Sequence, residues 1–169
     1  AGPMMAARDN FEILVRGRGS HAAMPHQGVD PVVVGSSIVM ALQTVISRNL
    51  DPQEALVISV TQFHAGTTAF NIIPDEVTLR GTCRVFSGAI QKSLPERITR
   101  IIEGVAATYG ATAELIYQNG YPATVNADGP SEFCADVASE IAGATGNVNR
   151  APLPSMGAED FSYMLQEKP

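Results

Sequence analysis

The stretch EVTLRGTCRVF, residues 76–86, contains the alternation on which the fold depends. Every second residue is apolar or small: Val77, Leu79, Gly81, Cys83 and Val85. The residues between them are polar or charged, up to Arg84. Successive side chains of a β-strand point to opposite faces of a sheet, so this pattern predicts a long strand with two distinct faces. Arg84 is predicted on the polar face, opposite Val77 and Val85.

Two more strands and a helix are predicted on the amino-terminal side of this strand. Residues 11–16 (FEILVR) alternate like a half-buried strand, and residues 56–63 (LVISVTQF) are rich in β-branched residues, which favour strands. Asp30 is a typical helix N-cap, and the proline that follows it suits a first helical position. A helix is therefore predicted over residues 31–48, and residues 64–74 are predicted to form a loop.

A second helix and a fourth strand are predicted on the carboxyl-terminal side. Ser93 and Glu96 have the spacing of a capping box, which predicts a helix start, and Gly110 is the expected stop. Residues 112–117 are predicted to form a strand. The order strand, helix, strand, strand, helix, strand is the ferredoxin-like split βαβ arrangement. The sequence therefore predicts an α+β domain with a four-stranded antiparallel sheet and two helices on one face.

The predicted domain covers residues 9–119, and the flanking segments differ from it. Residues 120–169 are rich in turn residues, with helices predicted only over residues 131–142 and from Met156 onward. This tail has too little apolar periodicity to form a domain alone. We therefore expect residues 1–8 and 120–169 to pack as pieces of a different body from the predicted domain.

The composition excludes some classes of function. The 169 residues carry a net charge of −6, so no basic surplus neutralises phosphates and no nucleic-acid partner is expected. No apolar run is long enough to span a bilayer, so no membrane partner is expected. Residues 1–10 lack the features of a signal peptide. Cys83 and Cys134 have no metal-binding spacing, and two lone thiols fit a reducing compartment better than a disulfide scaffold. A cytoplasmic location is therefore expected. Because the sequence begins at Ala1 without a methionine, the natural chain is expected to start upstream.

A histidine on a glycine-rich loop is the first candidate for chemistry. His21 lies in GRGSHAAMPH, residues 17–26, where small residues hold it on a tight loop at a strand end. Its imidazole can serve as a metal ligand, as a general acid or base, or as a donor to a developing oxyanion. An exposed loop histidine without a chemical role is the alternative, and the residues alone leave these hypotheses open. His26 and His64 fit supporting loop positions better.

Three further residues are candidates for substrate contacts. Asn71 can bind a substrate carboxylate or backbone, or it can simply support a turn. The guanidinium of Arg84 suits bidentate recognition of a carboxylate, with a solvated surface arginine as the alternative. Gly157 is followed by two acids at a predicted helix start, which can line an active site or only favour the helix dipole.

Four pieces of the chain, taken in order, resemble one family of enzymes. The pieces are GPMMAARDNFEI (2–13), GRGSHAAMPHQGVDP (17–31), FNIIPDEVTLRGTCRVF (70–86) and MGAEDFSYML (156–165). They are similar to the co-catalytic zinc metallopeptidases, which include aminoacylases, hippurate hydrolases, auxin-conjugate hydrolases and glutamate carboxypeptidases. The sequence HAAMPHQGVDP resembles the branch of this family that acts on N-acyl amino acids, which also includes N-acetyl-diaminopimelate deacetylases. The resemblance extends from Gly2 to about Gln166.

The resemblance implies a catalytic domain that is interrupted by a lid and dimerisation domain of ferredoxin-like order. Residues 9–119 match the lid, while residues 1–8 and 120–169 match partial α/β segments of the catalytic domain. The full-length enzyme is expected to bind two divalent metal ions (zinc, manganese or cobalt) and to form a homodimer through the lid. The family's metal-binding motifs have no counterpart in this sequence. No metal ligand is therefore expected in the fragment, which alone should be inactive.

The resemblance also implies roles for single residues. His21 matches the lid histidine that reaches the active site, in many relatives that of the partner subunit, and stabilises the tetrahedral oxyanion. Asn71 and Arg84 match lid residues that hold the substrate, and Arg84 is expected to grip the free carboxylate of the amino-acid half. Gly157 matches a catalytic-domain segment near the substrate pocket. The implied reaction is hydrolysis of the amide bond of a small N-acyl amino acid.

Two alternatives without catalysis remain open. The chain can be a stand-alone ferredoxin-like module that binds an amino acid, or a pure dimerisation scaffold. The flanking sequence distinguishes a stand-alone module from a part of an enzyme, because the enzyme needs a metal-binding motif upstream and a histidine-containing segment downstream. A charge-neutral substitution of His21 in the full enzyme distinguishes a pure dimerisation scaffold from a lid that takes part in catalysis.

Overall fold

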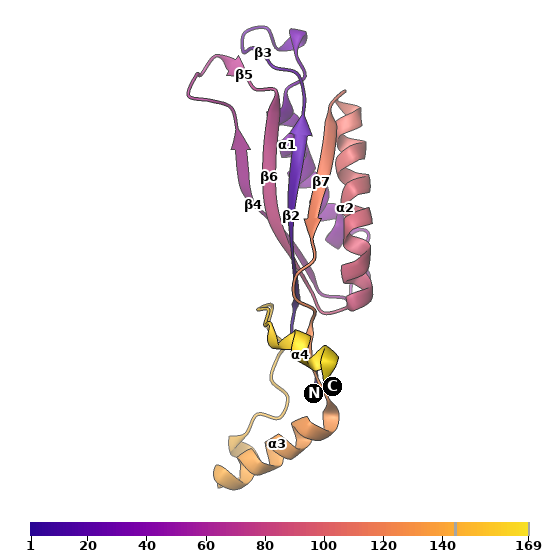
Figure 1. The fold of residues 1–169 in the computed structure, drawn as a ribbon, viewed down its shortest axis with the longest axis vertical. Coiled ribbons are helices and arrows are strands. Elements are labelled where there is room, and N and C mark those ends of the chain that lie inside the picture. Colours follow the sequence, from indigo (N-terminus) through magenta and orange to yellow (C-terminus); the bar gives the residue numbers. More distant parts are fainter. Residues whose placement is uncertain (144, 169) are drawn as a thin grey trace.

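Strand β6 (Glu76–Val85) lies inside a four-stranded antiparallel sheet, between two other long strands. The structure is a computed structural model that describes residues 1–143 and 145–168. The strands of the sheet are β2 (Ala7–Arg16), β4 (Leu56–Ala65), β6 (Glu76–Val85) and β7 (Thr112–Gln118). Their order across the sheet is β4-β6-β2-β7, as Figure 1 shows, and every neighbouring pair is antiparallel.

The alternation predicted for residues 76–86 is confirmed. Val77, Leu79 and Val85 are at most 1% exposed, while Arg84 lies on the opposite face and is only half-buried. The buried face is covered by α1 (Pro31–Ser47) and α2 (Gly88–Thr108), which contact each other as well as the sheet. The other face of the sheet has no covering helix in the part of the chain that the structure describes.

The core between the sheet and the helices is built from aliphatic side chains of all these elements. Its largest fully buried members are Ile13, Ile38, Leu42, Leu79, Leu94, Ile98 and Ile102. Burying one such side chain stabilises the fold by roughly 1.5–3 kcal/mol. The predicted α+β fold, with a four-stranded antiparallel sheet and two helices on one face, is confirmed.

The start of α1 follows the prediction, but the start of α2 does not. The Asp30 carboxylate accepts a hydrogen bond from the Val32 N–H at 2.8 Å, as expected of an N-cap. The capping box predicted at Ser93 is wrong, because α2 already begins at Gly88 and Ser87 is its N-cap. Ser93 lies inside the helix, where its hydroxyl donates to the Ile90 carbonyl at 2.8 Å.

Helix α2 also continues through Pro95, which has no N–H to donate to the Gln91 carbonyl. The side chains of Leu94 and Ile98 on either side of this proline are fully buried against the sheet. Their burial offsets the missing hydrogen bond, so tertiary packing overrides the local signals for a later helix start.

The loop predicted over residues 64–74 is partly wrong. Strand β4 continues to Ala65, with a register shift between Val60 and Gln62. Within the remaining segment, β5 (Ile72–Ile73) pairs antiparallel with β3 (Ser20–His21). Strands of two residues are too short to show an alternation in sequence. The turn after β3 contains a short 3₁₀ helix, η1 (Pro25–Gln27).

The terminal segments lie beyond one end of the sheet. Their elements are β1 (Gly2–Met5), β8 (Thr124–Asn126), α3 (Asp128–Ile141), η2 (Thr145–Asn147) and α4 (Phe161–Glu167). β1 pairs antiparallel with β8, and Figure 1 shows α3 far from the helices of the sheet. The helix predicted from Met156 begins only at Phe161. The division into residues 1–8, 9–119 and 120–169 stays a prediction, and β2 already begins at Ala7.

A buried carboxylate joins the sheet to this terminal part of the chain. Asp9 of β2 is 1% exposed and accepts hydrogen bonds from the Gln91 amide at 2.9 Å and the Tyr117 hydroxyl at 2.8 Å. It also accepts from the Gly120 N–H at 2.8 Å. Burial raises the pKa of the Tyr117 phenol well above its ordinary value, so this hydroxyl stays protonated and can donate. The three donors together satisfy a charge that burial would otherwise make costly.

The structure also shows the state of the two cysteine thiols and whether a helix could span a membrane. Both cysteines are free: Cys134 is exposed, while burial raises the pKa of the Cys83 thiol to about 12. Among the helices that the structure describes, none has the length and apolar character needed to cross a bilayer.

Gly81 permits the close approach of three strands and generates the first prediction. A Cβ atom at this position would lie 2.3 Å from both the Ser59 carbonyl oxygen and the Phe11 Cζ atom. Gly81→Ala should therefore lower the free energy of unfolding by about 1–3 kcal/mol, measured by urea denaturation. The control is Gly104→Ala in α2, where a Cβ meets nothing within 4 Å and should raise stability by roughly 1 kcal/mol. Equal effects of the two substitutions would contradict this account of Gly81.

The Asp9 junction generates the second prediction. Asp9→Ala leaves Tyr117 and the Gly120 N–H without their acceptor in a buried place, so stability should fall by about 3 kcal/mol. Asp51→Ala is the matched control, because this exposed carboxylate accepts only a local bond from the Gln53 N–H. It should change stability by no more than about 0.5 kcal/mol. Urea denaturation compares the two variants, and a small loss in Asp9→Ala would show that the junction is dispensable.

Candidate functional site

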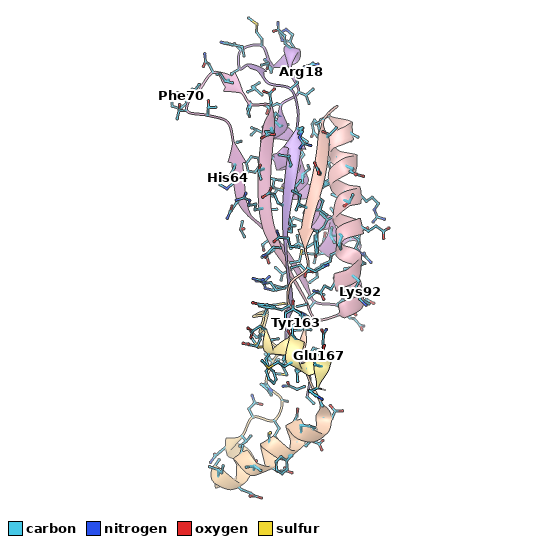
Figure 2. All side chains as sticks on the ribbon, viewed as in Figure 1. Arg18, His64, Phe70, Lys92, Tyr163 and Glu167 are labelled. Atoms are coloured by element: carbon cyan, nitrogen blue, oxygen red, sulfur yellow. The ribbon has the colours of Figure 1, made fainter. Side chains whose placement is uncertain are left out.

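His21 and Asn71 lie side by side at one end of the long sheet. Strands β3 and β5 pair Ser20 with Ile73 and His21 with Ile72. The Ala22 N–H donates to the Asn71 carbonyl at 2.9 Å, and the side chains of His21 and Asn71 are both exposed. Figure 2 places Arg18 and Phe70, which flank these two residues in sequence, at the same end of the molecule. The structure therefore brings two of the predicted site residues together.

The loop before His21 is held by close backbone approaches. The Asp75 carboxylate accepts from the Gly19 N–H at 2.7 Å, and the Asp75 carbonyl accepts from the Gly17 N–H at 2.8 Å. A Cβ atom at Gly17 would lie 2.1 Å from the Val29 carbonyl oxygen, so only glycine fits there. Sequence reasoning assigns Asp75 no role, although an acid just before a long strand, opposite a glycine-rich loop, is the available signal.

The hydrogen bonding of the His21 ring determines which nitrogen is free. The Ala23 N–H donates to Nδ1 of His21 at 3.1 Å, so Nδ1 is an acceptor. In the neutral ring the proton then resides on Nε2, which is a hydrogen-bond donor. The ring is exposed, and no bond to Nε2 occurs among the described residues. An Nε2–H on a loop held in this way can donate to an oxyanion of a bound molecule.

Arg84 lies near the opposite end of β6, on the open face of the sheet. Its Nη1 donates to the Cys83 carbonyl at 2.9 Å and to the Thr82 hydroxyl, which itself donates to the Asp9 carbonyl at 2.8 Å. Partial burial and the neighbouring Arg8 cation lower the pKa of the Arg84 guanidinium. A guanidinium fixed in this way can receive a carboxylate.

Gly157 lies near the same end of the sheet as Arg84. Its carbonyl accepts from the Ala6 N–H at 2.8 Å, next to β2, and its own N–H donates to the Ser155 hydroxyl at 3.1 Å. A Cβ atom at Gly157 would come within 3.3 Å of Met5 Cε, so the segment approaches β1 closely.

The four predicted site residues therefore form two separate clusters. His21 and Asn71 lie beyond the start of β6, while Arg84 is near its end and Gly157 lies close to that end. β6 runs from Glu76 to Val85, and a strand rises about 3.3 Å per residue, so the clusters are roughly 25–30 Å apart. One small molecule cannot contact both clusters of one chain.

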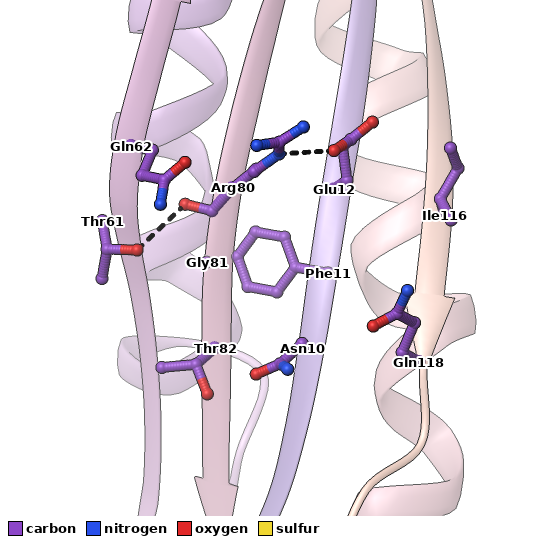
Figure 3. A pocket seen from close by; sticks show the side chains of 10 residues that line it. All are labelled: Asn10, Phe11, Glu12, Thr61, Gln62, Arg80, Gly81, Thr82, Ile116 and Gln118. Carbon is purple, nitrogen blue, oxygen red and sulfur yellow. Dashed lines mark hydrogen bonds and ion pairs between the residues drawn. The ribbon is translucent and has the colours of Figure 1, made fainter.

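The open face of the sheet is hollowed between the two clusters. A cavity of about 530 Å³ is lined by residues of all four strands, among them Gln62, Arg80, Glu12 and Gln118 (Figure 3). Arg80 Nε donates to the Glu12 carboxylate across the floor of this cavity at 2.6 Å. The cavity holds no histidine, and His64 of β4 is exposed, with Nε2 3.1 Å from the Gln62 amide oxygen.

No side chains gather into a metal site within residues 1–143 and 145–168. No group of three or more histidine, cysteine or acidic side chains is close enough there to hold an ion. His26 lies in η1 and is exposed. The side chains of these described residues therefore do not fit a two-metal centre.

A family model matches this chain, and its curated relatives include an amidohydrolase and a hippurate hydrolase. Residues 8–110 match the family described as "Peptidase dimerisation domain" of the M20 peptidases. An N-acyl-L-amino acid amidohydrolase of Geobacillus stearothermophilus is 45% identical over 127 residues, which are 75% of this chain and 34% of that protein. A hippurate hydrolase of Campylobacter jejuni is 36% identical over 168 residues, which are 99% of this chain and 43% of that protein.

Solved structures resemble the fold over nearly the whole chain. A putative aminohydrolase from methicillin-resistant Staphylococcus aureus has a TM-score of 0.83 and 35% identity, covering 99% of this chain and 43% of that one. A dinuclear metal binding peptidase of the M20 family from Bacillus subtilis has a TM-score of 0.76 and 32% identity, covering 99% and 40%. The chain thus spans less than half the length of these relatives. With residues 8–110 matched by its family model, this chain belongs to the M20 peptidase dimerisation domain family, which confirms the resemblance found in its sequence.

Proposed function

We propose that this chain is part of a metal-dependent amidohydrolase that cleaves the amide bond of N-acyl amino acids. The proposal is supported by relatives named N-acyl-L-amino acid amidohydrolase and hippurate hydrolase. The main structural support for the proposal is the hydrogen bonding of the His21 ring. Its Nδ1 accepts a hydrogen bond from the Ala23 N–H, so its Nε2 is free to donate to a ligand. Such a donor suits the oxyanion that forms when an amide carbonyl is attacked.

The whole protein is proposed to bind two divalent metal ions, such as zinc, manganese or cobalt. One solved relative is described as dinuclear metal binding, which supports this proposal. Metal ions would supply an activated water for hydrolysis. Because no suitable ligand cluster occurs among the described residues, the ligands have to come from outside this chain, and the chain alone should be inactive.

This chain contributes binding and charge stabilisation to the proposed reaction. Arg84 would hold the free carboxylate of the amino-acid half, and Gly157 would line the pocket beside it. His21 Nε2 would donate to the carbonyl oxygen as negative charge develops there, with Asn71 next to it. Since the two clusters are roughly 25–30 Å apart, His21 and Asn71 would act in the active site of a partner subunit.

A homodimer through the predicted lid satisfies this requirement. Strand β4 is an edge strand of the sheet, and its Phe63 is 40% exposed. Met40 of the neighbouring helix α1 is 71% exposed. An open edge with apolar side chains is a surface that a second copy of the chain can cover. In a dimer with two-fold symmetry, each subunit then supplies His21 to the other.

The first functional prediction concerns His21 in the full-length enzyme. His21→Ala should lower kcat far more than it raises KM, because an oxyanion donor acts mainly in the transition state. Losing one such donor typically lowers the rate on the order of 10²–10³-fold, roughly 3–4 kcal/mol. Steady-state kinetics on an N-acyl amino acid measures the effect, with metal analysis alongside. Metal lost from the variant would show that His21 is a ligand instead.

Mixed dimers extend this test to the partner subunit. If His21 serves the opposite subunit, a dimer of one His21→Ala chain and one Arg84→Ala chain contains one site with both residues intact. Mixing the two variants in equal amounts, with exchange of subunits and with substrate well below KM, should therefore restore roughly a quarter of the wild-type activity. If His21 and Arg84 of one chain serve the same site, mixing restores nothing.

The second functional prediction concerns Arg84. Arg84→Ala should raise KM, because the guanidinium holds the carboxylate in both the ground state and the transition state. The preference for a substrate with a free carboxylate over its amide should also shrink, while metal content stays unchanged. Kinetics on N-benzoylglycine and its amide measures this preference. Undiminished discrimination in the variant would reject the carboxylate role.

A further inference from the structure

Two arginines occupy directly opposite positions on the open side of the sheet. The register of β2 and β6 pairs Arg8 directly with Arg84, and both side chains are half-buried. Like charges in directly opposite positions destabilise a sheet. In the pairing of the same two strands, Arg80 faces Glu12 and forms an ion pair with it at 2.6 Å. The Arg8–Arg84 pair therefore departs from the charge pattern of its own strands.

Neither member of this pair has an acidic partner in the part of the chain that the structure describes. The ion pairs there involve Arg16, Arg80 and Arg150. Arg8 Nε is buried and has no hydrogen-bond partner among the described residues, and Arg84 donates only to the Thr82 hydroxyl and the Cys83 carbonyl. A buried guanidinium without an acidic partner is costly. Arg8 Nε itself is closed to a ligand, but the terminal Nη atoms of Arg8 make no hydrogen bond among the described residues and are left to donate to an anion.

The Arg8 guanidinium is nevertheless held in one orientation. It stacks on the Tyr121 ring, with 4.6 Å between Cζ and the ring centroid. The Tyr121 ring in turn contacts the ring of Tyr163 edge-on at 5.8 Å, and the Tyr163 hydroxyl donates to the Gly120 carbonyl at 3.0 Å. Figure 2 shows Tyr163 on α4, just beyond the end of the sheet. Residues from β2 and from the terminal segment thus hold the Arg8 guanidinium, which has no acidic partner among the described residues.

Gly120 makes this arrangement possible. A Cβ atom at Gly120 would lie 2.1 Å from the Arg8 carbonyl oxygen, so only glycine lets the segment with Tyr121 come this close. The Arg8 N–H also donates to the Tyr121 carbonyl at 2.9 Å. Backbone and side chain of Arg8 are therefore both fixed before any ligand arrives, which reduces the entropy lost on binding.

We propose that Arg8 and Arg84 together form one anion site, which binds the free carboxylate of the substrate between two guanidinium groups. The identity of the ligand rests on the proposed function, whereas the site itself rests on the arginine pair. Each guanidinium offers paired N–H donors that match the two oxygens of a carboxylate. Arg8 is then a substrate-binding residue that strengthens the preference for a free carboxylate, a role the sequence analysis does not assign to it.

The test uses full-length enzyme with Arg8→Gln, and Arg80→Gln as the matched control. Arg80 lies on the same strand face as Arg84 but is paired with Glu12. The ratio of kcat/KM for N-benzoylglycine over its amide should fall on the order of tenfold in Arg8→Gln, mainly through KM. The ratio should stay at the wild-type value in Arg80→Gln. Unchanged discrimination in Arg8→Gln, with or without a loss of thermal stability, would overturn the proposal.

A second measurement does not depend on turnover. N-benzoylglycine should raise the melting temperature of the wild type and of Arg80→Gln more than that of Arg8→Gln, because a bound ligand stabilises the native state. Equal shifts in all three proteins would count against the site. If Arg8→Gln does not fold, Arg8→Lys replaces it, since an ammonium cannot share a carboxylate in the same bidentate way. Wild-type discrimination in Arg8→Lys would also overturn the proposal.

The outcomes separate this inference from the proposed function. If the wild type hydrolyses no N-acyl amino acid, the proposed function fails, while the melting-temperature shifts still test the anion site. If Arg84→Ala loses discrimination but Arg8→Gln behaves like Arg80→Gln, the proposed function stands and only the role of Arg8 fails.

Discussion

The burial of one face of β6 is the constraint on which the rest of the structure depends. Val77, Leu79 and Val85 have to be covered, and two helices on the same side of the sheet cover them. Because both helices are used on that side, the opposite face stays open and polar, and Arg80, Arg84 and Arg8 project from it. The same arrangement leaves β4 as an uncovered edge. The open face and this edge are the surfaces on which the functional proposals rest.

Patterns that repeat along the chain were sufficient to predict the main fold. The alternation in residues 76–86 and the N-cap at Asp30 correspond to what the structure contains. Signals that occur once were less reliable, as Ser93 shows: its spacing to Glu96 fits a capping box, but the burial of Leu94 extends the helix past it. Strands as short as β3, β5, β1 and β8 leave no pattern in sequence, because their pairing depends on contacts between distant segments.

The candidate site shows the same division between local and long-range information. The tight loop of His21 and the strand position of Arg84 are visible in sequence, whereas their roles came from the family resemblance. The separation of the two clusters depends on the length and register of β6, which becomes definite only in the folded sheet. Asp9 and Arg8 were missed because their significance lies in distant partners, Gln91, Tyr117 and Tyr121. No spacing of neighbouring residues in the sequence predicts contacts between segments that are this far apart along the chain.

The hydrogen bond between the Arg8 N–H and the Tyr121 carbonyl has a consequence for evolution and engineering. At 2.9 Å, it places the entry and the exit of the intervening chain at one point. A segment whose ends already meet can be inserted into a host protein without stretching the host, and can be removed with only a short bridge in its place. Joining its ends would also permit circular permutation of the ferredoxin-like unit, with new termini in the exposed turn around Gln53. From this one backbone contact we expect the segment between Arg8 and Tyr121 to tolerate transfer into another host protein.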